Sequence, residues 1–121
     1  MTTAAVTHPL VAAIADALDR GDRAALAALY AADATYSTVG GAHPPADPMR
    51  LHGAEVGEYL RGIPQEIRIC LEDHLVGADG RVAFRTTCRF PEGGRAVTAH
   101  LVALDGDGRI ATHDCVEAVD Q

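Results

Sequence analysis

Residues 95–120, RAVTAHLVALDGDGRIATHDCVEAVD, contain the pattern that decides the fold class. Two strand-like runs, 96–104 and 109–119, flank the tetrapeptide Asp-Gly-Asp-Gly at 105–108. Asp and Gly tolerate the positive φ angles that a tight connection between antiparallel strands needs. The pattern therefore predicts a β-hairpin at the end of the chain.

Two histidines in this hairpin are the first candidates for a functional site. If Leu104 and Arg109 close the turn, His100 lies directly opposite His113 on one face, with Cβ atoms about 5 Å apart. Two imidazoles at that distance do not both hold a proton easily, so one or both would titrate near or below neutrality. The pair therefore suits acid–base chemistry. The interpretation depends on the register, because a slip of one residue would place the two rings on opposite faces.

Composition limits the protein class. A chain of 121 residues with 48% hydrophobic and 22% charged residues is typical of one globular domain, here 1–121. The net charge of −7 argues against a nucleic-acid or anionic-membrane partner. All ten basic residues are arginine, and the absence of lysine excludes Schiff-base catalysis.

The three cysteines, Cys70, Cys88 and Cys115, are widely spaced and form no CxxC motif. Neither a disulfide framework nor a metal site is indicated, and we expect no cofactor. No apolar run approaches the ~20 residues of a membrane span, and the N-terminus lacks a signal-peptide pattern. We therefore expect a reduced, cytoplasmic protein.

The first half of the chain is predicted to be mainly helical. Apolar spacing predicts helices at about 8–19, 23–31 and 54–61, with a strand at 33–39 between the second and the third. The stretch 40–50, which includes His43, is rich in Gly and Pro and is expected to be an irregular loop at the mouth of a pocket.

The second half is predicted to form a four-strand antiparallel meander, with strands at 66–76, 81–90, 95–104 and 109–119. Alternation places Leu75 on the same face of the first of these strands as Ile67, Ile69 and Leu71. Both faces of 95–104 are apolar, so we expect the outer face to be covered by a second subunit, which predicts a homodimer. Helices segregated from antiparallel strands indicate an α+β fold, and a curved sheet over helices leaves a pocket for a small apolar ligand.

Two segments carry a family resemblance. Residues 17–22, ALDRGD, and 26–35, LAALYAADAT, match an opening of the form "L..GD...L..LFADDAT". Gly53 before the third helix and Asp107-Gly108-Arg109-Ile110 in the last hairpin also fit. Across residues 8–119 the chain resembles the nuclear-transport-factor-2-like superfamily, and within it the group of ketosteroid isomerases and SnoaL-like polyketide cyclases. The resemblance implies a cystatin-like cone, with three N-terminal helices packed on a curved antiparallel sheet that encloses a pocket.

The catalytic residues of the steroid isomerases are missing. Their tyrosine and two aspartates fall near Ile14, at Thr38 and at His100, so isomerase activity by that mechanism is not expected. SnoaL-like cyclases are similar in placing a histidine on the penultimate strand and an ionisable residue on the last, which corresponds to His100 with His113 or Cys115.

The sequence thus predicts His100 and His113 as catalytic residues, with Tyr36 or Tyr59 as a donor to a ligand carbonyl. The remaining pocket positions are expected to bind substrate: Tyr36, Thr38, Tyr59, Phe84, Thr86, Cys88, Phe90, Val102 and Cys115. The expected reaction is cofactor-free proton transfer on an apolar or aromatic carbonyl compound, such as a polyketide-type intermediate, leading to cyclisation or isomerisation. Two alternatives stay open. One is a non-catalytic ligand-binding or assembly module. The other is an epoxide hydrolase or dehydratase, for which Glu117 is the last-strand carboxylate.

Overall fold

The computed structural model describes residues 8–40 and 48–120. Its elements are α1 (Pro9–Arg20), α2 (Arg23–Ala27), β1 (Tyr30–Gly40), β2 (Met49–His52), α3 (Ala54–Arg61), β3 (Arg68–Val76), β4 (Arg81–Arg89), β5 (Arg95–Leu104) and β6 (Ile110–Asp120). Within these ranges no helix has the length and hydropathy to span a bilayer.

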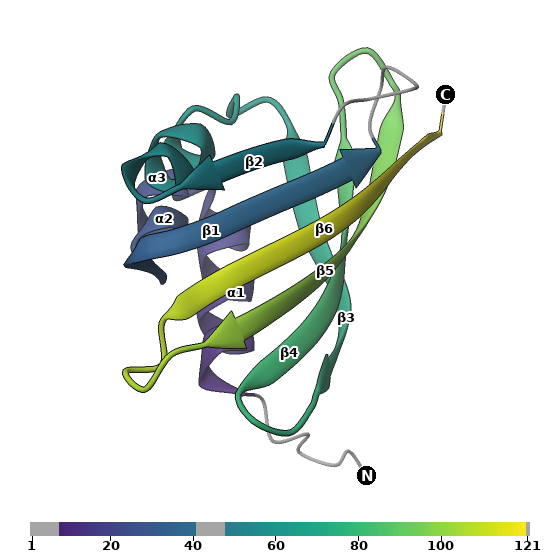
Figure 1. Ribbon diagram of the computed structural model, residues 1–121. Coiled ribbons are helices and arrows are strands. Elements are labelled where there is room, and N and C mark those ends of the chain that lie inside the picture. Colours follow the sequence, from purple (N-terminus) through teal and green to yellow (C-terminus); the bar gives the residue numbers. More distant parts are fainter. Residues whose placement is uncertain (1–7, 41–47, 121) are drawn as a thin grey trace, which may run out of the picture.

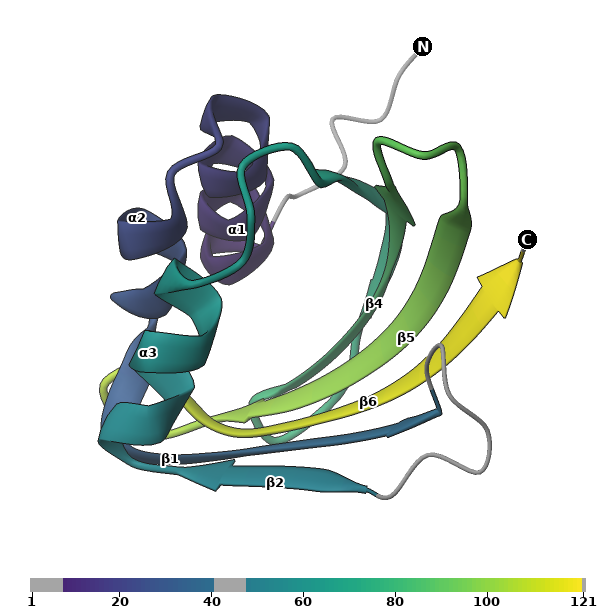
Figure 2. The ribbon, with the colours of Figure 1, turned by 90° about the horizontal axis from the view of Figure 1, so that it is seen from above.

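The six strands form one curved sheet, in the order β2-β1-β6-β5-β4-β3. The helices lie on its concave side, and together with the sheet they form an open cone (Figures 1 and 2). This α+β arrangement confirms the predicted fold class. One expectation was wrong: the sheet is not wholly antiparallel, because β1 runs parallel to β6. In addition, only α1 and α2 precede the first strand, and α3 lies between β2 and β3.

Local capping sets the ends of the first two helices. The side chain of His8 accepts a hydrogen bond from the backbone N–H of Leu10, and Gly21 ends α1 in the left-handed conformation that glycine favours. Asp22 caps α2 through the N–H of Ala25. However, α2 ends at Ala27 rather than near 31, because the carbonyl of Leu29 already accepts a hydrogen bond from the N–H of Ile110 in β6.

The predicted loop 40–50 contains more regular structure than expected. Gly40 ends β1, and Met49 begins β2, which pairs with β1 from Thr38↔Met49 to Thr35↔His52. Strand β2 was missed because four residues are too few for a periodic pattern. Residues 41–47, with His43 among them, lie outside the described residues.

The hairpin register differs from the prediction by two residues. His100 pairs with Cys115, and His113 pairs with Val102. The turn closes at Leu104↔Ile110 rather than at Leu104↔Arg109, which shifts the pairing by one residue. A bulge near Ala111 adds the second residue, because the next pair is Ala103↔Thr112. A shift of two preserves the alternation of faces, so the two histidines still share the inner face, as diagonal rather than direct neighbours.

A second bulge, near Glu72 in β3, reverses the faces of the residues that follow it. Before it, Leu71 pairs with Thr86, and after it His74 pairs with Phe84. Leu75, predicted to share a face with Leu71, is therefore on the opposite face and is 72% exposed. The core lies between the helices and the concave face of the sheet, and its largest fully buried side chains are those of Ile110, Val56, Val82 and Val102.

The convex face of the sheet carries exposed apolar side chains in the single chain. Leu101 on β5 and Val116 on β6 are 49% and 59% exposed. The predicted homodimer through this face stays a prediction.

Candidate functional site

The cone encloses a cavity of about 530 Å³ between the helices and the concave face of the sheet. Nine of the eleven predicted site residues line it: Tyr36, Thr38, Tyr59, Phe84, Thr86, Cys88, Phe90, His100 and His113. The other two, Val102 and Cys115, are buried beneath the wall and are not among the lining residues. The inner-face positions predicted from strand alternation therefore largely converge on one space.

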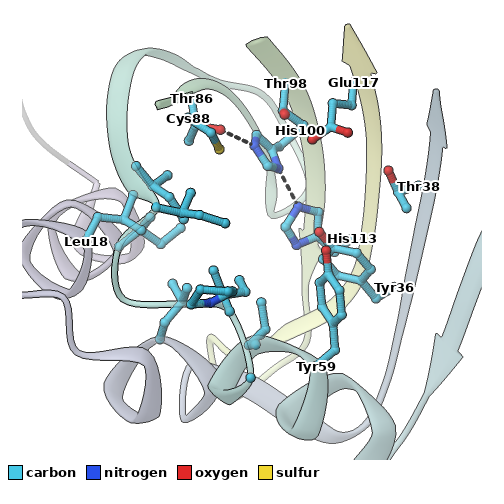
Figure 3. A pocket seen from close by; sticks show the side chains of 18 of the residues that line it. Leu18, Tyr36, Thr38, Tyr59, Thr86, Cys88, Thr98, His100, His113 and Glu117 are labelled. Carbon is cyan, nitrogen blue, oxygen red and sulfur yellow. Dashed lines mark hydrogen bonds between the residues drawn. The ribbon is translucent and has the colours of Figure 1, made fainter. Parts of the chain in front are cut away.

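At the centre of the sheet wall the two histidines are in direct contact. Nδ1 of His100 lies 2.8 Å from Nε2 of His113, within hydrogen-bond distance. Figure 3 shows both rings pointing into the cavity, joined by this bond. The two imidazoles are thus in contact, as predicted, although the two histidines are diagonal rather than direct neighbours in the hairpin.

The two outer ring nitrogens are also occupied. Nε2 of His100 lies 2.7 Å from the hydroxyl of Thr86, and Nδ1 of His113 lies 2.6 Å from the hydroxyl of Tyr30. Three hydrogen bonds therefore join Thr86, His100, His113 and Tyr30 into one chain across β4, β5, β6 and β1, which we call the imidazole chain.

Tyr30 was not among the predicted site residues, because it falls within the second predicted helix, 23–31. In the structure it begins β1, it is buried, and it lines the cavity. The signal that was available is chemical: a buried tyrosine hydroxyl generally needs a hydrogen-bond partner.

Aromatic rings fix the orientation of both imidazoles. Phe84 stacks on His100, with ring centroids 4.4 Å apart and planes 10° apart. The ring of Tyr36 packs edge-on against His113, with ring centroids 4.6 Å apart and an angle of 62° between the ring planes. Because each imidazole is held by hydrogen bonds at both nitrogens and by a packed ring, neither can rotate without losing several contacts.

Burial keeps the pair uncharged. It lowers the pKa of both His100 and His113 well below that of a free imidazole, and for His113 the neighbouring His100 lowers it further. Burial also raises the pKa of the Tyr30 hydroxyl. At neutral pH the imidazole chain therefore consists of four neutral groups.

The fixed charge inside the cavity is negative. Among the described residues that line it, the only formally charged side chains at neutral pH are those of Glu58 and Glu117. Burial raises the pKa of the Cys88 thiol to about 11, and the carboxylate of Glu117 contributes to that shift across the cavity. An anionic ligand would therefore meet repulsion in this space.

Three donor atoms have the spacing of a metal site. Those of His100, His113 and Cys115 all lie within 4.8 Å of one another, the one such cluster in the part of the chain that the structure describes. Binding would require breaking the hydrogen bond between the imidazoles. It would also require a thiolate at Cys115, whose pKa burial raises to about 11. We therefore assign no metal to this cluster.

A small α+β cone with a ligand-sized cavity and ionisable groups on its inner sheet face defines a class of small-molecule enzymes and binders. The model of the SnoaL-like domain family matches residues 11–113, and the chain belongs to that family. No protein with a curated description matches it.

Solved structures agree on the fold. A putative ketosteroid isomerase from Kribbella flavida has 18% sequence identity and a TM-score of 0.72, over 93% of this chain and 77% of that one. SalBIII, described as an epoxide hydrolase/cyclase-like enzyme in pyran ring formation in polyether salinomycin, has 20% identity and a TM-score of 0.68. The match covers 90% of this chain and 88% of that one. A Mycobacterium tuberculosis protein in complex with estradiol-17beta-hemisuccinate has 16% identity and a TM-score of 0.68, over 88% of each chain. At these identities the likeness establishes the fold, not the activity.

Proposed function

We propose that this protein catalyses cofactor-free proton transfer on an apolar, uncharged carbonyl compound, leading to isomerisation or cyclisation. His100 and His113 are the acid–base unit. The observation that carries the proposal is the hydrogen bond between their rings at the wall of a cavity large enough for a fused-ring ligand.

The environment of the pair supports an acid–base role. A neutral imidazole offers one nitrogen that accepts a proton and one that donates, so a single pair can remove a proton and return one. Phe84 and Tyr36 pack against the rings and shield them in part from water, which strengthens polar contacts to a bound substrate. Such general acid–base groups contribute roughly 10²–10⁴-fold to a rate.

The lining of the cavity narrows the substrate class. Its walls are mainly aliphatic and aromatic, and its charged groups are both carboxylates. A neutral aromatic ketone fits these walls better than a carboxylic acid or a phosphate ester. The absence of an arginine from the described lining residues also disfavours an Asp–Arg–Asp arrangement for epoxide opening.

Deuterium exchange tests the proposal. 2-Tetralone, a bicyclic ketone with exchangeable protons beside its carbonyl, would be incubated with the protein in D₂O and followed by ¹H NMR. We expect the wild type to accelerate exchange and both His100→Gln and His113→Gln to slow it by about 100-fold. His52→Gln, at an exposed position on β2, is the matched control.

The same experiment separates the enzyme from the binding module. Binding of 2-tetralone is measured in parallel from its NMR line broadening. If the ketone binds but its exchange is no faster than in buffer, the proposed catalysis is wrong, and a ligand-binding function takes its place.

A further inference from the structure

The imidazole chain leaves no ring nitrogen free to meet a substrate. Both nitrogens of His100 and both nitrogens of His113 already have hydrogen-bond partners. The groups at its two ends, Tyr30 and Thr86, both line the cavity. The hydrogen-bonding capacity that remains for a ligand is therefore at these two hydroxyls and not at a ring nitrogen.

The chain can hold its protons in either of two directions. In one, Tyr30 donates to Nδ1 of His113, Nε2–H of His113 donates to His100, and Nε2–H of His100 donates to Thr86. In the other, every donor becomes an acceptor. Both directions satisfy each of the three hydrogen bonds, and in both directions all four groups are neutral.

The first direction is favoured at rest, because a phenol is a stronger hydrogen-bond donor than an aliphatic alcohol. In that state Thr86 accepts from His100, so its own hydrogen is left for a ligand. The oxygen of Tyr30 has a lone pair left for a proton. One end of the chain is thus an acid and the other end a base.

We propose that Tyr30 and Thr86 are the substrate-contacting ends of an uncharged proton relay, and that its substrate is a fused-ring ketone with the reacting C–H and C=O on opposite sides of a ring. The inference rests on the proposed function and adds to it two catalytic residues and a substrate geometry. It explains how a buried pair that resists protonation can still move protons.

The spacing of the strands sets this geometry. Tyr30 is on β1 and Thr86 is on β4, with β6 and β5 between them. Neighbouring strands are about 4.8 Å apart, so on a curved sheet the two hydroxyls are separated by on the order of 10 Å. A C–H next to its own carbonyl is too close to span both ends. In anthrone the CH₂ and the C=O face each other across the central ring, and with a hydrogen bond at each end it fills such a gap.

The transfer balances without a charged intermediate. The C–H bond of anthrone breaks, and its proton goes to the oxygen of Tyr30 while Tyr30 passes its own proton to His113. His113 passes one to His100, His100 passes one to Thr86, and Thr86 gives one to the carbonyl oxygen. The C–H electron pair becomes a ring double bond, and the product is 9-anthrol. Water then removes a proton at Tyr30 and supplies one at Thr86, which restores the first direction.

Two probes separate the relay from the proposed function. Anthrone spans both ends, whereas 2-tetralone reaches only one end and exchanges by a step that leaves charge on the imidazole chain. We expect Thr86→Val and Tyr30→Phe to lower the ratio of anthrone exchange to 2-tetralone exchange at least tenfold, and Thr86→Ser to restore it. Thr87→Val, a buried threonine whose side chain lies on the opposite face of β4, should keep the wild-type ratio.

Nitrogen NMR tests the continuous hydrogen-bonded chain on which the relay depends. In either direction of the relay both histidines have the same tautomer, with hydrogen on Nε2 in the first and on Nδ1 in the second. Long-range ¹H–¹⁵N spectra should show matching tautomers for His100 and His113. Thr86→Val should also shift the ¹⁵N signals of His113, which Thr86 does not touch.

The outcomes are distinct. Opposite tautomers of the two histidines would overturn the relay, and so would an unchanged ratio of anthrone exchange to 2-tetralone exchange in Thr86→Val. In either case the acid–base pair still stands if His100→Gln stops 2-tetralone exchange. If His100→Gln exchanges 2-tetralone as fast as the wild type, the proposed function itself fails.

Discussion

Acid should destabilise this protein through its buried histidines, and His100→Gln should remove part of that effect. His100 is held neutral by burial, which lowers its pKa from the ordinary 6.5 to about 4. The unfolded state therefore binds a proton more readily than the folded state below neutrality. Stability from this group is complete above about pH 6.5 and is lost as the pH falls toward 4.

The magnitude follows from the two pKa values. Between about pH 7.5 and about pH 5, a group with these values costs the wild type ~2 kcal/mol of unfolding free energy. Glutamine does not titrate, so His100→Gln escapes this loss. Whatever stability the variant lacks near neutrality, the difference between the two proteins should shrink by ~2 kcal/mol over that interval. Titrating carboxylates affect both proteins equally and cancel in the difference.

Urea unfolding at a series of pH values measures this difference. Far-ultraviolet circular dichroism is the suitable signal, because the chain has no tryptophan. Equal urea dependences of the two proteins would show that their unfolded states are comparable. His52→Gln, at an exposed histidine, should show no such pH dependence relative to the wild type. A wild-type advantage over His100→Gln that stays constant from neutral to acid pH would refute the argument that burial keeps this imidazole neutral.

Three further changes test the framework of the site. Gly40→Ala should destabilise far more than Gly108→Ala by thermal unfolding. Both glycines have positive φ, but a Cβ at Gly40 would clash with the backbone oxygen of Glu117 in β6. At Gly108, no atom of the described residues other than its chain neighbours lies within 4 Å of such a Cβ. Ile110→Ala removes a fully buried side chain and should cost about 2–5 kcal/mol in urea unfolding. Glu117→Gln should improve the affinity for 2-naphthylacetate severalfold relative to that for uncharged 2-ethylnaphthalene, because it removes a charge that repels the carboxylate. A fluorescence titration measures both affinities. Glu72→Gln, on β3 outside the cavity lining, should leave the ratio of the two affinities unchanged.

The elements whose signals are local were predictable from sequence. His8, Gly21 and Asp22 act on neighbours within a few residues, and so the start and end of α1 and the start of α2 could be predicted within a residue. The inner faces of β4 and β5 were also predictable, because alternation in a strand depends only on the strand itself. That is why His100 and Thr86 were correctly expected on one inward surface.

What tertiary structure decided was pairing between distant segments. The end of α2, the existence of β2 and the parallel match of β1 to β6 depend on which backbone partners are available, and no local pattern encodes this. The bulges near Glu72 and Ala111 likewise arise between two strands. The first turned Leu75 outward, and the second, together with a turn that closes at Leu104↔Ile110, made the histidine contact diagonal.

By itself, then, the sequence determined the fold class, the helix caps and the side of the sheet on which the two histidines lie. Tertiary structure decided that their rings share a hydrogen bond and that Tyr30, 83 residues away from His113 in the chain, completes the contact. The physical reason is that strand alternation is an intrinsic property of each segment. A hydrogen bond between side chains, in contrast, depends on register, curvature and burial, which exist only once the segments have packed together.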